Sequence, residues 1–213
     1  MGVININIYL LSYNESLNYD LEKYIELLPY ERKKQVLAYK FKKDKDLCIL
    51  SYLLLRHAIK LEMNINSRCD FIKNKYGKPY FKGIPNVYFS ISHCDSGIVC
   101  GISNIEIGVD IQDVKKFNQS ILKIACCREE IDLLLKGNNK EELFFKMWSI
   151  KESYIKADGR GVNIKISDIN TIGFLDNCIS YNNMFVSACY KYKNKIEIVK
   201  DIKMIEVNIE ELQ

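Results

Sequence analysis

The sequence predicts an α+β fold, and three observations support this. Short runs that alternate apolar and polar residues are typical of strands. Two long segments, 44–62 and 140–157, carry apolar residues every three or four positions, as amphipathic helices do. Each of these segments precedes a short polar loop and a further strand candidate, at 69–72 and at 167–170. This weak internal repeat suggests two halves that meet near Asn104.

The other elements follow from the same patterns in chain order. Strands are expected at 4–10, 68–73, 87–92, 97–103 and 105–111, an amphipathic segment at 21–28, and shorter helices at 31–41 and 120–136. Asp44 or Asp46 is expected to cap the first long helix, and Gly159 to end the second in the left-handed conformation. The remainder, 164–209, alternates in short runs and is expected to be rich in strands.

Composition places the chain among ordinary globular proteins. Its 213 residues are 48% hydrophobic and 27% charged, which excludes intrinsic disorder as the main state. The net charge of +4 is too mild for a protein that coats nucleic acid, but it is compatible with an anionic small molecule or an acidic partner. No stretch reaches the ~18 to 20 apolar residues that span a bilayer. Residues 1–5 lack the features of a secretory signal, so we expect a cytoplasmic protein without a membrane partner.

Eight cysteines raise the question of disulfides or a zinc site. None are spaced as C-x-x-C, and the chain has only two histidines. We therefore expect most of the cysteines to be small buried apolar side chains in a reducing compartment.

The first candidate site is a turn around Lys78. Gly77 permits an unusual backbone and Pro79 fixes the turn, so Lys78 is held between them. A rigidly held lysine suits a phosphate group. A solvated lysine on a surface turn is the alternative.

The second candidate lies at the end of the expected strand 87–92. Alternation puts Ser90 and Ser92 on one face, with His93 at the strand end, where loops often carry function. A Ser–His pair could indicate a hydrolase. However, neighbouring residues of a strand point to opposite faces, and the G-x-S-x-G elbow is absent, which argues against one. A structural histidine remains the alternative.

The third candidate joins a strand to a helix. Asp110 and Gln112 share a strand face, while Glu152 and Lys156 are four residues apart on one helix face. The two carboxylates could converge on Mg²⁺, which takes one or two protein carboxylates together with phosphate oxygens and water. Lys156 could then neutralise phosphate. The alternative is an ordinary Glu–Lys pair on a solvated helix.

In combination, these motifs resemble a known family, the 4′-phosphopantetheinyl transferases, and in particular the surfactin-type (Sfp-like) monomeric class. The matching motifs occur in family order: Gly77-Lys78-Pro79, Ser92-His93, Gly108-Val109-Asp110-Ile111, Trp148-Ser149-Ile150-Lys151-Glu152-Ser153-Tyr154-Ile155-Lys156 and Gly159-Arg160-Gly161. The helix motif W-S-x-K-E-S-x-x-K is the most specific of them. The resemblance is carried by residues 77–161, and the general plan extends over nearly the whole chain.

The resemblance implies a fold and an activity. The fold is an intramolecular pseudo-dimer of two similar α/β halves, here 1–104 on the nucleotide side and 105–213 on the metal and catalytic side, with coenzyme A between them. The activity is Mg²⁺-dependent transfer of the 4′-phosphopantetheine arm of coenzyme A to a serine of an apo acyl or peptidyl carrier protein. Adenosine 3′,5′-bisphosphate is released. The resemblance also implies a monomer, and we expect no nucleic-acid partner.

The resemblance also assigns roles to residues of this sequence. Asp110, Glu152 and Gln112 would bind Mg²⁺, and Glu152, Lys156 and His93 would be catalytic. Lys78, Pro79, Ser92, His93, Lys151 and Lys156 would bind coenzyme A. Glu152 would take the serine proton, either directly or through a metal-bound water, and Lys156 would offset charge on the phosphates.

Two positions depart from the family pattern. Gln112 stands where the family often has a carboxylate, so metal binding should depend more on Asp110 and Glu152. Leu47 stands where the family tends to carry an arginine that faces the 3′-phosphate. Arg32, Lys33, Lys42 or Lys45 could substitute for it.

Two rival functions remain open, of which only the first is supported by these two departures. One is a non-catalytic relative that binds coenzyme A or a carrier protein. The other is nucleic-acid binding through the basic segment 31–45.

Overall fold

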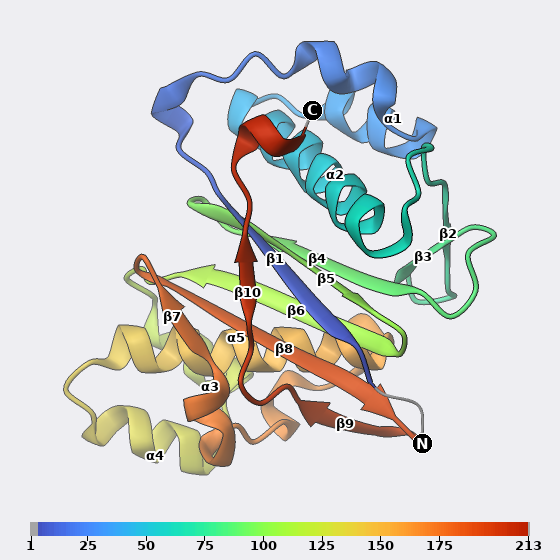
Figure 1. Cartoon of the computed structure of the whole chain (residues 1–213). Helices are drawn as coiled ribbons and strands as arrows, with labels where there is room; N and C mark the ends of the chain where they lie inside the picture. Colours follow the sequence, from blue (N-terminus) through green and yellow to red (C-terminus); the bar gives the residue numbers. More distant parts are fainter. Residues whose placement is uncertain (1–3, 213) are drawn as a thin grey trace.

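The computed structural model describes residues 4–212 and has an α+β fold in four layers (Figure 1). Helices α1 (Tyr30–Ala38) and α2 (Lys42–Met63) cover one sheet, and helix α5 (Lys140–Asp158) covers the other. The two sheets pack against each other in the middle of the molecule. Residues 1–3, part of the segment searched for a secretory signal, lie outside the described residues.

The two sheets contain eight of the strands. The first sheet has the order β10-β1-β5-β4, and the second has the order β6-β8-β7, with β9 also paired to β8. Their bounds are Ile6–Ser12 (β1), Tyr88–His93 (β4), Gly97–Ser103 (β5), Glu106–Asp113 (β6), Ile179–Tyr181 (β7), Met184–Tyr192 (β8), Lys195–Ile198 (β9) and Met204–Glu206 (β10). All neighbours are antiparallel except β1 and β10. Strand β10 therefore returns from the second half of the chain to the first sheet.

The remaining elements are short. Strands β2 (Phe71–Lys73) and β3 (Pro79–Phe81) form a separate hairpin. The other α-helices are α3 (Leu122–Ala125) and α4 (Arg128–Lys136). The 3₁₀ turns are Glu15–Leu17, Glu22–Leu27, Gln119–Ile121, Gly161–Asn163, Ile166–Asp168, Ile172–Asn177 and Ile209–Leu212. Within residues 4–212, no helix combines the length and apolar character needed to cross a membrane.

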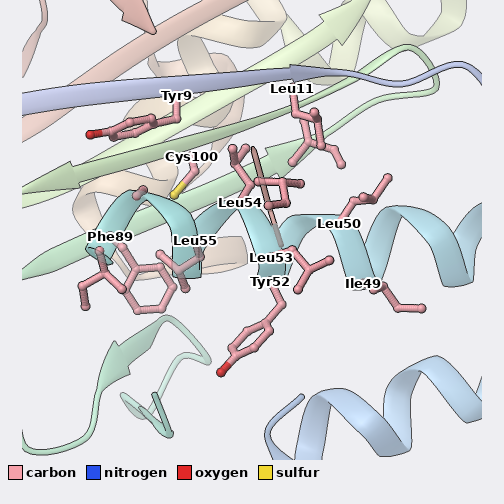
Figure 2. Close-up of a cluster of buried hydrophobic side chains, with 14 of the residues drawn as sticks. Tyr9, Leu11, Ile49, Leu50, Tyr52, Leu53, Leu54, Leu55, Phe89 and Cys100 are labelled. Carbon is pink, nitrogen blue, oxygen red and sulfur yellow. The ribbon is translucent and has the colours of Figure 1, made fainter. Parts of the chain in front are cut away.

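Alternation along β1 divides the core into two parts. Tyr9 and Leu11 face α2, where they pack with leucines such as Leu50 and Leu54 (Figure 2). The intervening Ile8 and Leu10 face the second sheet. Burying a leucine contributes about 1.5–3 kcal/mol, so both faces of this strand stabilise the fold. The eight cysteines are unpaired, and six of them are buried as expected of small apolar side chains.

The predicted α+β class is confirmed, and most predicted elements are present within a few residues of their expected bounds. The expected C-cap is also correct, because Gly159 has φ +82°. The expected N-cap of the first long helix is wrong. Helix α2 begins at Lys42 without a side-chain cap, and Asp46 instead accepts hydrogen bonds from Lys42 and Tyr13.

Two other predicted elements are wrong for a shared reason. Segment 120–136 is interrupted at Cys126 and Cys127, which are extended, and the strand expected at 167–170 is absent, because a 3₁₀ turn forms at Ile166–Asp168. Glu130 accepts hydrogen bonds from the backbone N–H groups of Cys127 and Thr171. Lys151 donates to the carbonyl oxygens of Ile166 and Ile169. Buried side chains thus satisfy backbone groups that a helix or a sheet would otherwise pair.

Glu130 and Lys151 also form a buried ion pair of 2.7 Å, and both side chains are almost fully buried. Burial alone would raise the pKa of Glu130, but hydrogen bonds from Lys151 and Thr171 hold it below its ordinary value. This pair fastens the segment after α5 to α4 and α5.

Strand β6 lies unusually close to helix α5 at Gly108. A Cβ atom at this position would meet the carbonyl oxygen of Ser153 at 2.1 Å and the backbone nitrogen of Ala157 at 2.2 Å. Both are backbone atoms of α5, so no side-chain rotation could make room. Only glycine allows this approach of strand to helix.

We predict that Gly108→Ala lowers the free energy of unfolding by more than the ~1–3 kcal/mol typical of overpacking, because helix and strand must separate. Urea denaturation followed by circular dichroism measures this. Gly173→Ala is the matched control, since a Cβ there meets nothing within 4 Å. Equal stability of the two variants would contradict the close approach.

We predict that Lys151→Met lowers the free energy of unfolding by about 3–5 kcal/mol, because Glu130 would remain buried without its partner. The double variant Lys151→Met/Glu130→Gln should lose less than the single variant, since it leaves no uncompensated charge. The same denaturation experiment tests both. A loss below 1 kcal/mol in the single variant would show that the pair is dispensable.

Candidate active site

A cavity of about 610 Å³ lies where strand β4, the turn before β3 and helix α5 meet. Its lining includes the charged side chains of Arg32, Lys78, Glu152 and Lys156. Its apolar lining is formed mainly by Trp148, Ile155, Val162, Ile164 and Ile166. Polar and apolar walls in one cleft suit a ligand that carries both phosphates and an uncharged chain.

Serine hydroxyl groups join the edges of the two sheets beside this cleft. The Ser90 Oγ accepts a hydrogen bond of 3.0 Å from the backbone N–H of Val109, and the Ser92 Oγ donates one of 2.7 Å to Asp110 Oδ1. Alternation correctly placed both serines on one face of the strand. It gave no sign that Ser90 would pair with β6, because that contact depends on how the sheets pack.

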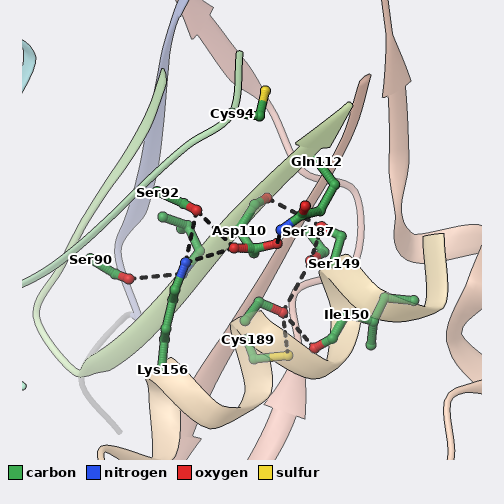
Figure 3. Close-up of polar contacts among 12 residues, drawn as sticks. Ser90, Ser92, Cys94, Asp110, Gln112, Ser149, Ile150, Lys156, Ser187 and Cys189 are labelled. Atoms are coloured by element: carbon green, nitrogen blue, oxygen red, sulfur yellow. Dashed lines mark hydrogen bonds and ion pairs between the residues drawn. The ribbon is translucent and has the colours of Figure 1, made fainter. Parts of the chain in front are cut away.

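Asp110 is the centre of a buried polar cluster (Figure 3). Its Oδ1 lies 2.6 Å from the Lys156 ammonium, and its Oδ2 accepts a hydrogen bond of 2.8 Å from the Gln112 amide. The Lys156 ammonium also donates to the Ser92 Oγ at 2.8 Å. The structure therefore brings together four of the residues predicted from separate motifs.

Glu152 lies one helical turn before Lys156 and also lines the cleft. Burial raises the pKa of its carboxyl above the ordinary value, and the negative charge of Asp110 raises it further, partly offset by Lys156. Among residues 4–212, no side chain or backbone group forms a hydrogen bond or ion pair with this carboxylate. A half-buried carboxylate of this kind suits a proton acceptor or a cation ligand.

The donor set near Asp110 fits Mg²⁺ better than a transition metal. Within the described residues, no group of three or more His, Cys, Asp or Glu side chains is placed to hold a metal. Asp110 and Glu152 supply carboxylate oxygens, and Gln112 has an amide oxygen. This is the oxygen-only set of one or two carboxylates that Mg²⁺ uses when substrate phosphates and water complete its shell.

His93 is exposed at the end of β4. Partial desolvation by the surrounding protein lowers the pKa of its imidazole, and the positive charges of Lys156 and Arg32 lower it further. A neutral imidazole beside two cations can donate one hydrogen bond without adding charge. Its role beside a phosphate stays a prediction.

Lys78 lies in the cleft wall, but its ammonium is already engaged. It forms an ion pair with Glu106 and donates to the carbonyl oxygens of Ile107 and Ala157 at 3.2 Å each. Burial lowers the pKa of Lys78, while Glu106 opposes this effect. Lys78 therefore connects the turn before β3 to β6 and α5. Glu106 was not identified from the sequence, because no local pattern marks it.

The structure does not bring Lys151 to the cleft. Its side chain is 1% exposed, and its ammonium is bonded to Glu130 and two carbonyl oxygens on the far side of α5 from Asp110. The prediction that Lys151 binds coenzyme A does not fit this placement. The physical reason is the burial of Glu130, which requires a cation nearby.

The basic residue that could replace an arginine at Leu47 can now be chosen. Leu47 is a residue of α2, and its side chain is 3% exposed in the hydrophobic core. Lys33 pairs with Glu26, and Lys42 pairs with Asp46. Lys45 lines a different cavity. Arg32 is the remaining candidate, and it lines both the cleft and a neighbouring cavity of about 1090 Å³ between α1 and the β2–β3 hairpin.

Two models of one protein family match the chain. A family model described as 4′-phosphopantetheinyl transferase, N-terminal, matches residues 15–104. A second, described as the 4′-phosphopantetheinyl transferase superfamily, matches residues 106–197.

Named relatives agree as well. The chain is 37% identical to the 4′-phosphopantetheinyl transferase gsp of Aneurinibacillus migulanus over 64% of its own length and 58% of that protein. It is 28% identical to the 4′-phosphopantetheinyl transferase Sfp of Bacillus subtilis over 70% and 68% of the two chains. It is 29% identical to an L-aminoadipate-semialdehyde dehydrogenase-phosphopantetheinyl transferase of Candida glabrata over 79% and 68%. The two family models together match residues 15–104 and 106–197, and the chain belongs to the 4′-phosphopantetheinyl transferase superfamily.

Proposed function

We propose that this protein transfers the 4′-phosphopantetheine arm of coenzyme A to a serine of an apo acyl or peptidyl carrier protein and releases adenosine 3′,5′-bisphosphate. The main observation behind this proposal is the cleft lined by Glu152 and Lys156, whose ammonium also contacts the buried carboxylate of Asp110. The names of the relatives support it. Because the matched region spans only 58% of the first of them, the activity is a proposal for this chain.

The two halves of the chain would divide the task. Residues 1–104 would form the nucleotide side, and residues 105–213 the metal and catalytic side. Arg32 and Pro79 line both the cleft and the larger cavity beside it, so a ligand as long as coenzyme A can extend from one into the other. We place the 3′-phosphate near Arg32, the pyrophosphate near His93 and Lys156, and the pantetheine arm along the apolar wall at Trp148.

The residues of the cleft can perform the reaction. The serine oxygen forms a bond to the phosphorus that carries the pantetheine arm, and the bond from that phosphorus to the bridging oxygen breaks. Such a transfer needs charge stabilisation more than covalent help. The Lys156 ammonium and the His93 imidazole would orient the phosphates and offset their charge. Held by Asp110, Glu152 and Gln112, Mg²⁺ would supply further charge neutralisation at the pyrophosphate.

Glu152 is the proposed acceptor of the serine proton. Its carboxylate has no hydrogen-bond partner within residues 4–212, and its raised pKa favours holding a proton once it has been transferred. In this scheme, Lys78 positions the turn before Pro79 through its bonds to β6 and α5, and does not contact phosphate.

The setting of the reaction is part of the same proposal. We expect a cytoplasmic monomer whose partners are coenzyme A and a carrier protein, without nucleic acid or membrane. The mild net charge of +4 supports an anionic ligand rather than a nucleic acid.

We predict that an apo carrier protein incubated with the chain, coenzyme A and Mg²⁺ gains the mass of one phosphopantetheine arm. Intact-mass spectrometry detects this gain. Asp110→Asn and Glu152→Gln should each lower the rate by about 10²-fold or more, since each removes a group that acts in the transition state. Glu142→Gln, in the first turn of α5, is the matched control and should react normally. No gain on several unrelated carriers would refute the activity.

We predict that Arg32→Ala raises the KM for coenzyme A by about tenfold or more, because a charge-assisted bond to the 3′-phosphate is lost. The KM for 3′-dephospho-coenzyme A should change little. Lys33→Ala, on the same helix but paired with Glu26, serves as the control and should alter neither value. Equal losses with both substrates would show that Arg32 does not recognise the 3′-phosphate.

A further inference from the structure

Both carboxylate oxygens of Asp110 are already in use. Oδ1 is shared by the Lys156 ammonium at 2.6 Å and the Ser92 hydroxyl at 2.7 Å, while Oδ2 is bonded to the Gln112 amide nitrogen at 2.8 Å. A carboxylate has about four acceptor positions, so three of them are occupied here. The side chain of Asp110 is 2% exposed, so it has little access to solvent through the fourth.

Glu152 is in the opposite condition. It comes from the same face of α5 as Lys156, it lines the cleft, and no group within the described residues bonds to it. The two carboxylates that would hold a divalent cation therefore differ sharply in availability. Glu152 can accept a cation directly, whereas Asp110 must first give up a partner.

Lys156 is the partner that opposes a cation most strongly. Its ammonium contacts Asp110 Oδ1 directly, so a divalent cation on that oxygen would lie within a few ångströms of another positive charge. At such distances two like charges repel by several kcal/mol even at an effective dielectric constant of about 20. The two cations therefore compete for one oxygen.

Gln112 adds a second obstacle on the other oxygen. It presents its N–H₂ group to Asp110 Oδ2, and a donor group cannot ligate a cation. Rotation about its last side-chain bond would present the amide oxygen, at the loss of that hydrogen bond. A carboxylate at this position would have no donor to present and would need no such rotation.

We propose that Lys156 and Gln112 are positioning residues that make cation binding at Asp110 depend on the phosphates of the substrate. Lys156 lines the cleft as well as contacting Asp110, so an anionic ligand there can draw its ammonium away. When the ammonium moves away, one of the two occupied positions on Oδ1 becomes available to the cation, while the Ser92 hydroxyl keeps the other. The cation and the phosphate-bearing ligand then bind with positive coupling, and each raises the affinity for the other by the same factor. This inference rests on the function proposed above.

The test measures Mn²⁺ binding to the full chain, by electron paramagnetic resonance of free Mn²⁺, without any nucleotide. Lys156→Met should bind Mn²⁺ about tenfold or more tightly than the unmodified chain, because its competitor is gone. Lys146→Met lies on the same helix, over the Phe185 ring, and changes the net charge equally. It should bind Mn²⁺ like the unmodified chain.

The reciprocal measurement uses coenzyme A. Trp148 is the only tryptophan and lines the cleft, so its fluorescence reports coenzyme A binding with and without Mg²⁺. In the unmodified chain Mg²⁺ should tighten coenzyme A binding about tenfold or more, and in Lys156→Met this gain should shrink. If Lys156→Met does not fold by circular dichroism, Lys156→Gln keeps a hydrogen-bond donor without the charge and tests the same competition.

The outcomes separate this inference from the proposed function. Equal Mn²⁺ affinity in Lys156→Met and the unmodified chain would overturn the competition while leaving the metal site intact. Mn²⁺ binding that is unchanged in Asp110→Asn, or absent from every variant, would overturn both the metal site and the competition. Coenzyme A binding, as reported by Trp148 fluorescence, is measured separately in either case.

Discussion

The contact between strand β6 and helix α5 at Gly108 is the constraint on which the rest of the site depends. Backbone atoms of the helix lie within 2.2 Å of the place where a Cβ of residue 108 would be, so only glycine allows the strand and the helix to approach this closely. Two residues along the strand, Asp110 points the same way and meets Lys156 of the same helix. A wider spacing would move the Asp110 carboxylate away from Lys156, and their ion pair would be lost.

Ion pairs with glutamates determine which lysines of the sequence motifs are available to bind a substrate. Lys151 neutralises Glu130, and Lys78 neutralises Glu106, so both ammonium groups are committed to holding segments of the chain together. Lys156 differs from them, because it pairs with the buried Asp110 while its own side chain is 29% exposed and lines the cleft. The helix motif therefore combines two roles. Lys151 holds the segment after α5 through its bonds to Ile166 and Ile169, and Lys156 lines the cleft.

Local pattern predicted much of the fold and some of the contacts in the candidate site. The period of α2 and α5, the strand face shared by Asp110 and Gln112, and the left-handed end at Gly159 all depend on neighbours in sequence, and they are correct. The misplaced elements depend on distant partners. The strand expected at 167–170 is absent, and Glu130 and Lys151 bond the backbone in and around this segment. The helical period does not reveal that Lys151 is buried.

The measurement that tests this account most directly is a crystal structure of the chain with coenzyme A and Mn²⁺, located by anomalous scattering. The account predicts an anomalous peak between Asp110 and Glu152, with the Lys156 ammonium on a phosphate oxygen and no longer on Asp110. A peak elsewhere, or a Lys156–Asp110 contact that persists beside the bound cation, would contradict it.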